Sequence, residues 1–129
     1  MKNYKDKLEI FNSLSELERY RLCYNGIYKN EPDFIFIYSK LIKHIGFIDI
    51  CKFKYYSNLM IGIAIKPEYR NKGIARHLLK SALNSFKVRN KTISYVVDKE
   101  NIASINLIES FNYDYIKDYK YDYEYIFNL

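Results

Sequence analysis

One stretch of the sequence decides the fold class: Ile63-Ala64-Ile65-Lys66-Pro67-Glu68-Tyr69-Arg70-Asn71-Lys72-Gly73-Ile74-Ala75. An apolar run over 59–65 predicts a buried strand, and Pro67 ends it because proline cannot donate to a strand ladder. A helix is expected to begin at Gly73, where unpaired backbone N–H groups carry partial positive charge. A short loop leading into such a helix can hold a phosphate. Arg70 and Lys72 add full positive charges to this loop, and Arg76 adds another just inside the expected helix.

The flanking sequence predicts the other elements by their periodicity. Strands are expected over 34–38, 41–50 and 92–97, and two more over 113–127 with a turn near 118–120. Helices are expected over 73–86, with Phe86 on the apolar side, and from Asn101 onward. At the N-terminus we expect a short strand over 4–10. A helix should follow, with a capping box of Ser13 and Glu16 and a stop at Asn25-Gly26. Strands 59–65 and 92–97 should run parallel, giving an α/β (α+β mixed sheet) domain.

Length and composition place the chain among globular proteins. Its 129 residues suit one domain, 1–129, and 49% of them are apolar. No apolar run is long enough for a membrane helix and no secretory signal is seen, so we expect a cytoplasmic protein without membrane contact. Cys23 and Cys51 are too far apart in sequence for a zinc motif, and we expect no metal site.

Positive charge is concentrated in the middle of the chain. The whole chain carries +6, while residues 40–91 hold 12 basic residues against Asp49 and Glu68, a balance of +10. Such a stretch indicates an anionic partner, either nucleic acid or a phosphorylated small molecule. Nucleic acid is a possible partner on grounds of charge alone, since no motif of an RNA-binding fold or helix-turn-helix is present.

The pattern Arg70-x-x-Gly73-x-Ala75 resembles the pyrophosphate loop of the GCN5-related N-acetyltransferase (GNAT) family. Residues 97–107, with Asn101 and Ser104, resemble the family's second strand-to-helix segment, and 44–48 resemble the strand before the cofactor strand. The resemblance covers roughly residues 34–127. It implies a GNAT-like fold with a short N-terminal region that holds one clear helix.

The resemblance implies an acetyl-CoA-dependent N-acetyltransferase that acts on a primary amine of a small molecule, peptide or protein. Ile63 and Ile65 match positions whose backbone pairs with the pantetheine arm and the acetyl carbonyl. Asn101 and Ser104 match positions that touch the other side of the arm. The positions that hold the pyrophosphate through backbone N–H groups are matched by Arg70, Asn71, Lys72, Gly73, Ile74 and Ala75.

The sequence departs from the family pattern in its catalytic groups. Ile108 occupies the position where the family often has a proton-donating tyrosine, and isoleucine cannot donate a proton. The cofactor strand contains no carboxylate, so the general base is open among His44, Asp49, Tyr56 and Asp98. We take His44 and Asp98 as candidate catalytic residues. Histidine suits the role of a base because the unperturbed pKa of this residue type lies close to neutral pH. A site without a clear carboxylate base favours α-amines as acceptors, because roughly one α-amine molecule in seven is already neutral at pH 7.

Two other functions remain open. A CoA-binding domain without catalysis, acting as a sensor or interaction module, would explain Ile108. An acetyltransferase acting on an RNA-linked amine, such as aminoacyl-tRNA, would use the basic stretch. The tyrosines that alternate over 113–125 could pack in the sheet, line an acceptor pocket or form a homodimer surface.

Overall fold

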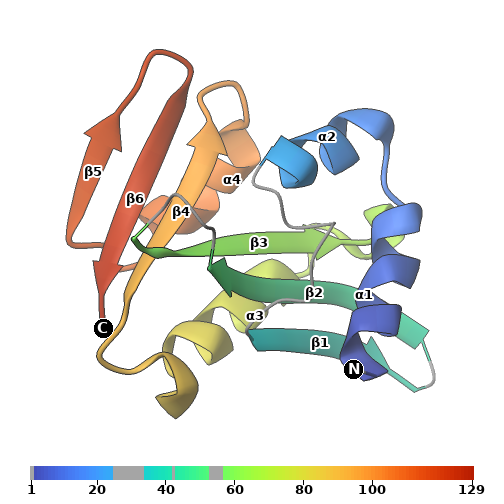
Figure 1. Cartoon of the computed structure of the whole chain (residues 1–129). Coiled ribbons are helices and arrows are strands. Elements are labelled where there is room, and N and C mark those ends of the chain that lie inside the picture. The colour runs from blue at the N-terminus through green and yellow to red at the C-terminus, as the bar shows by residue number, and fades with distance from the viewer. Residues whose placement is uncertain (1, 25–33, 42, 53–56) are drawn as a thin grey trace.

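The computed structural model describes residues 2–24, 34–41, 43–52 and 57–129 (Figure 1). Its elements, in chain order, are α1 (Lys2–Asn12), α2 (Glu16–Tyr24), β1 (Phe34–Lys40), β2 (Lys43–Lys52), β3 (Leu59–Ile65), η1 (Pro67–Tyr69), α3 (Ile74–Leu83), η2 (Phe86–Val88), β4 (Thr92–Asp98), α4 (Ile102–Glu109), β5 (Tyr115–Asp118) and β6 (Asp122–Asn128). No helix in the described ranges is long and apolar enough to span a bilayer.

The strands form one mixed sheet in the order β1-β2-β3-β4-β6-β5. All neighbouring pairs are antiparallel except β3 and β4, which run parallel as predicted. The expected strands over 34–38, 59–65 and 92–97 and the C-terminal hairpin are confirmed. Apolar runs for the inner strands and alternation for the C-terminal hairpin therefore predicted the sheet.

The parallel pair β3–β4 is joined only at its beginning. Leu59 pairs with Ile93 and Met60 with Ser94, and the ladder ends there. Beyond these residues the two strands diverge, as Figure 1 shows for β3 and β4. This separation opens a gap in the middle of the sheet at the carboxyl ends of both strands.

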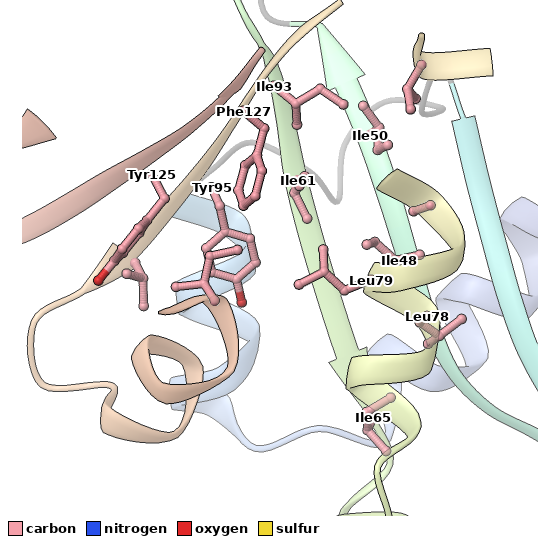
Figure 2. Packing of buried hydrophobic residues seen from close by; sticks show 14 of the residues in the cluster. Ile48, Ile50, Ile61, Ile65, Leu78, Leu79, Ile93, Tyr95, Tyr125 and Phe127 are labelled. Atoms are coloured by element: carbon pink, nitrogen blue, oxygen red, sulfur yellow. The ribbon is translucent and has the colours of Figure 1, made fainter. Parts of the chain in front are cut away.

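The two faces of the sheet carry different cores. Ile48 packs with Leu78 and Leu79 of α3, in a cluster that extends to Tyr95 and Tyr125 (Figure 2). The neighbouring Phe47 points to the opposite face and packs with residues of α1 and α2. The helices thus cover both faces and leave the end of the β3–β4 gap between them.

The N-terminal segment corrects the prediction. Residues 4–10 lie in α1 and not in a strand, so the prediction of a short N-terminal strand was wrong. The buried side of α1 contains Lys7 and Ile10, and Lys7 Nζ lies 2.6 Å from a carboxylate oxygen of Asp49 on β2. Because a charged lysine occupies the buried side of α1, a search for periodic apolar side chains does not detect this helix.

The N-terminal region contains two helices, not one. The capping box is formed by Ser15 and Glu18 instead of Ser13 and Glu16. Glu18 N donates to Ser15 Oγ (3.2 Å), and Ser15 N donates to Glu18 Oε1 (3.0 Å). Ser13 instead donates its hydroxyl to the Ile10 carbonyl (2.6 Å), next to the end of α1. The sequence contains two overlapping boxes, and only the structure distinguishes them.

Two further boundaries differ from the expectation. Helix α3 ends at Leu83, and Phe86 belongs to η2 with 77% of its surface exposed, so its assignment to the apolar side was wrong. β2 begins at Lys43, and Leu41 lies in the preceding turn with a φ of 57°. The expected helix stop at Asn25-Gly26 lies outside the described residues, as does Tyr56.

Candidate functional site

A cavity of about 860 Å³ occupies the gap between β3 and β4. Its walls come from the carboxyl halves of both strands, the loop before α3 and the first turn of that helix, the first turns of α4, helix α2 with the preceding Leu14, and the end of the β5–β6 turn with the start of β6. Nine of the ten residues proposed from the sequence to bind the cofactor line it: Ile63, Ile65, Arg70, Asn71, Gly73, Ile74, Ala75, Asn101 and Ser104. Of the proposed cofactor residues, only Lys72 is not part of the wall.

The backbone of β3 faces the cavity with unpaired groups. Lys66 N donates to the Ile45 carbonyl on β2 (2.9 Å), so the N–H and C=O groups of Ile65, one residue earlier, point away from β2. Alternation along the strand gives Ile63 the same direction. Neither residue has a pairing partner on β4 in the described chain. The N–H groups of Ile63 and Ile65 and the Ile63 carbonyl therefore point into the gap without a partner strand among the described residues, whereas the Ile65 carbonyl accepts a hydrogen bond from Arg70.

The loop before α3 has the backbone of an anion cradle. Asn71 (φ 62°) and Gly73 (φ 78°) both adopt left-handed conformations, which turn successive N–H groups toward a common point. Gly73 is the N-cap of α3 and supplies no side-chain oxygen to the N–H groups of the first turn. No acidic residue lies in that turn. These groups remain available for a phosphate.

The side chain of Arg70 is directed away from this cradle. Its Nε donates to the Ile65 carbonyl (3.0 Å), and its guanidinium forms an ion pair with Glu18 of α2. Its backbone N–H donates to the Pro67 carbonyl (3.3 Å). Burial acts to raise the pKa of Glu18, but the hydrogen bonds from Ser15 and the charge of Arg70 outweigh it and lower that pKa. Arg70 therefore ties the loop to α2 and to the end of β3.

The opposite wall is formed by α4 and β4. Asn101 caps α4 through a hydrogen bond that its side chain accepts from Ser104 N (3.4 Å). The Ser104 hydroxyl lies 2.5 Å from the hydroxyl of Tyr95 on β4. Figure 2 shows the Tyr95 ring running from β4 toward α4, with its oxygen at the end remote from the strand.

Tyr95 is a site residue that the sequence analysis missed. Its side chain is 4% exposed and lines the cavity. Burial raises the pKa of its hydroxyl, opposed in part by the hydrogen bond with Ser104, so the group keeps its proton at neutral pH. Ile108, at the family's tyrosine position, is fully buried and does not line the cavity. The apolar pattern of β4 did not indicate that one of its buried residues places a hydroxyl beside Ser104 of the cavity wall.

The geometry fits coenzyme A. The unpaired backbone edge of β3 suits the amide-containing pantetheine arm, and the cradle at Gly73 suits a pyrophosphate. The cavity continues past these two features toward α2 and the β5–β6 turn, which leaves space for a second substrate. A family model described as the acetyltransferase (GNAT) family matches residues 3–113. The chain belongs to this family.

Solved structures agree with this assignment at the level of the fold. The GNAT domain of S. lividans PAT is 11% identical and superposes with a TM-score of 0.77 over 100% of this chain and 86% of its own. The ribosomal-protein-S18-alanine N-acetyltransferase from Escherichia coli is 20% identical, with a TM-score of 0.65 over 98% of this chain and 86% of its own. The PaiA N-acetyltransferase from Thermoplasma acidophilum, in complex with coenzyme A, is 17% identical, with a TM-score of 0.64 over 88% and 68%. No curated protein sequence matches the chain.

The acetyltransferase places its two candidate bases differently. Asp98 lines the cavity at the end of β4, where its Oδ1 accepts a hydrogen bond from Glu100 N (2.9 Å) and its Oδ2 lies 3.9 Å from Arg21 Nε. His44 is not part of the cavity wall. Its Nδ1 lies 2.8 Å from the Ser39 hydroxyl, and its Nε2 lies 3.2 Å from Asp6 Oδ1.

The far end of the acetyltransferase cavity includes Tyr121, one of the alternating tyrosines over 113–125, and three residues that the sequence analysis did not propose for the site. Tyr20 and Arg21 come from α2, Tyr121 comes from the β5–β6 turn, and Asp122 is the first residue of β6. Asp122 pairs with Asp98 in the β4–β6 ladder, so two carboxylates lie at this end. Only the assembled fold brings α2 and the C-terminal hairpin to the same opening.

The C-terminal tyrosines divide into two groups. Tyr125 is fully buried and its hydroxyl donates to Glu109 (2.9 Å), while its ring makes edge contacts with Tyr113 and Tyr123. Tyr119 and Tyr121 are exposed near the β5–β6 turn, as is Tyr115 on β5.

Among the described residues no group of three or more His, Cys, Asp or Glu side chains could hold a metal ion.

Proposed function

We propose that this acyltransferase moves the acetyl group of acetyl-CoA to a primary amine of low pKa, and that its acceptor is the α-amine of a peptide or protein. The observation that supports it is the single cavity that joins the β3 edge, the cradle at Gly73 and an open end at α2 and the β5–β6 turn. The E. coli neighbour named for the alanine of a ribosomal protein acts on this class of acceptor.

Each wall of the cavity has a part in this proposal. Bound acetyl-CoA supplies an acetyl thioester. The N–H groups at Asn71–Ala75 hold its pyrophosphate, and Asn101 and Ser104 contact the arm from the side of α4. The backbone of Ile63 and Ile65 fixes the arm in the gap, where an N–H can donate to the acetyl oxygen as negative charge develops there. The chain thus aligns an acetyl carbon with an amine entering from α2.

Tyr95 is our candidate proton donor in place of the missing tyrosine at position 108. Tyr95 is buried and lines the cavity, and its protonated hydroxyl lies beside the hydroxyl of Ser104, another residue of the cavity wall. A proton held at Tyr95 Oη can pass to the sulfur as the carbon–sulfur bond breaks, and the Ser104 hydroxyl then stabilises the phenolate. General acid catalysis of this kind contributes about 10²–10⁴-fold.

On the acceptor side we propose Asp98 as the group that takes the proton from the attacking amine. It lies in the cavity wall, whereas His44 lies against Asp6 and Ser39 outside it. His44 stays a candidate base, but the proton of the amine would have to pass to it through water because His44 does not line the cavity. An acceptor of low pKa reduces the demand on either group because part of it is already neutral at pH 7.

A second candidate is a CoA-binding domain without catalysis. The observation that favours it is Ile108, which closes the usual position of the proton donor with a fully buried aliphatic side chain. Under this alternative the cavity would bind acetyl-CoA without releasing thiol in the presence of any amine.

The test is thiol release from acetyl-CoA with three acceptors. They are a peptide with a free α-amine and no lysine, the same peptide with its α-amine blocked and one lysine added, and spermidine. We expect release with the first peptide and at least tenfold less with the other two. Preference for the blocked lysine peptide or for spermidine would contradict the acceptor class. Binding of acetyl-CoA without release with any acceptor would favour the second candidate.

A further inference from the structure

The end of α3 that lies away from the cavity, together with the turns that follow it, carries four cations and an exposed aromatic ring. Lys80 lies on the outer side of α3, and Phe86, Lys87, Arg89 and Lys91 follow in and after η2. All five side chains are exposed, and Phe86 is exposed to 77%. We name these five residues the distal patch.

The backbone holds the distal patch in a defined shape. Three successive turns close through hydrogen bonds from Val88 N to Ser85 O (3.2 Å), from Arg89 N to Phe86 O (3.3 Å) and from Lys91 N to Val88 O (3.2 Å). The fully buried Val88 anchors them in the core. Phe86, Lys87, Arg89 and Lys91 therefore lie in compact turns, and Lys80 lies on the helix before them.

In the described part of the chain, no ion pair joins an Asp or Glu side chain to the distal patch. The sequence contains no Asp or Glu between Glu68 and Asp98. Other cations of this chain do have acidic partners: Lys66 pairs with Glu9 and Lys99 with Asp118. Lys87 instead lies 6.0 Å over the ring of Phe36. A concentrated positive surface without compensating acids attracts a polyanion.

The distal patch is separate from the acetyl-CoA site. The ten residues of α3 place about 15 Å between the cradle at Gly73 and the end of the helix. None of the five residues lines the cavity. The phosphates of a bound cofactor at the cradle therefore do not account for these charges.

We propose that the distal patch binds a single-stranded nucleic acid, with Phe86 as a stacking platform for a base. Lysine and arginine side chains around an exposed aromatic ring are the elements by which proteins hold unpaired strands. An acidic protein would use the charges but would gain little from the exposed ring, so the ring favours a nucleic acid. This inference does not depend on the acceptor of the acetyl group.

The test is fluorescence anisotropy with labelled 12-nucleotide oligo-uridine and oligo-thymidine, which distinguish RNA from DNA as the source of the strand. We expect binding by the wild-type chain at low salt, with an affinity that falls as salt rises. Four phosphate contacts predict a logarithmic slope of about −2.8. The triple variant Lys80→Glu/Lys87→Glu/Lys91→Glu should lose more than tenfold in affinity and keep its affinity for acetyl-CoA, which reports an intact fold.

Matched controls separate the distal patch from overall charge. Lys40→Glu/Lys43→Glu/Lys117→Glu changes the net charge equally, on the β1–β2 hairpin and β5, and should reduce binding much less. Phe86→Ala should weaken binding about tenfold without changing the salt slope, whereas Tyr115→Ala on β5 should not. Equal losses in the two triple variants, no binding to either strand, or displacement by polyglutamate as effective as by unlabelled oligonucleotide would overturn the proposal.

Discussion

Tyr95 is the residue whose role can be tested by removing one oxygen atom. Tyr95→Phe should lower kcat by about 10²-fold, because the proposed proton donor is lost, and leave the affinity for acetyl-CoA within about twofold. Steady-state kinetics and calorimetry measure the two quantities. Tyr113→Phe, a half-buried tyrosine outside the cavity, is the control and should leave kcat unchanged. An unchanged kcat in Tyr95→Phe would contradict the assignment.

The buried pair of Lys7 and Asp49 gives a pH-dependent contribution to stability. Burial raises the pKa of Asp49 from 3.8 to about 6, because it outweighs the opposing charge and hydrogen bond of Lys7. A raised folded-state pKa means that stability is fully present below 3.8 and is lost as the pH rises through about 6. Urea unfolding should therefore show a larger stability difference between the wild type and Lys7→Met/Asp49→Leu at pH 5 than at pH 7.5.

Single substitutions of this pair are the control. Asp49→Leu alone leaves the Lys7 ammonium buried without its carboxylate and should cost about 3–5 kcal/mol. The double variant should cost much less because both charges are gone. A double variant as unstable as Asp49→Leu, or a stability difference that grows above pH 6, would show that the pair does not behave in this way.

Among the secondary-structure elements, α2 is the helix that links the N-terminal region to the cofactor loop. Its capping box uses Ser15 and Glu18, and Glu18 also holds Arg70. Ser15→Ala should lower the free energy of unfolding by about 1 kcal/mol through loss of the N-cap. Thermal or urea unfolding measures this loss. Ser81→Ala, on the exposed side of α3, should be neutral or slightly stabilising. Equal effects of the two substitutions would contradict the observed box.

The sequence predicted most elements because their buried faces are apolar and periodic. Every residue of strand β5 is exposed, whereas strands β2, β3, β4 and β6 and helix α3 follow this rule. The N-terminal helix α1 does not, because a buried Lys7 pairs with Asp49 from a distant strand. A local pattern cannot contain the partner of such a charge. Phe86 failed for the opposite reason, since an apolar residue in an otherwise helical pattern is exposed.

At the scale of the whole molecule, the site depends on a separation that no local pattern encodes. The cofactor loop was visible in the sequence, since its strand, glycine and helix are contiguous. The placement of Tyr95 beside Ser104 depends on how β4 and α4 pack. The meeting of Tyr20 and Tyr121 at one opening depends on the ladder of β3 and β4 ending after two pairs. Both arrangements depend on how separate elements pack, so they became evident only in the folded structure.

The central claim is that the backbone cradle at Gly73 holds the pyrophosphate of acetyl-CoA. The matched variants Gly73→Asp and Gly73→Asn test it, because both residues tolerate the left-handed conformation and differ mainly in charge. Open space surrounds the position that a β-carbon would take. Calorimetric titration with acetyl-CoA should show binding to the wild type and to Gly73→Asn, and a loss of at least tenfold in Gly73→Asp. Equal affinities in the two variants would contradict the account.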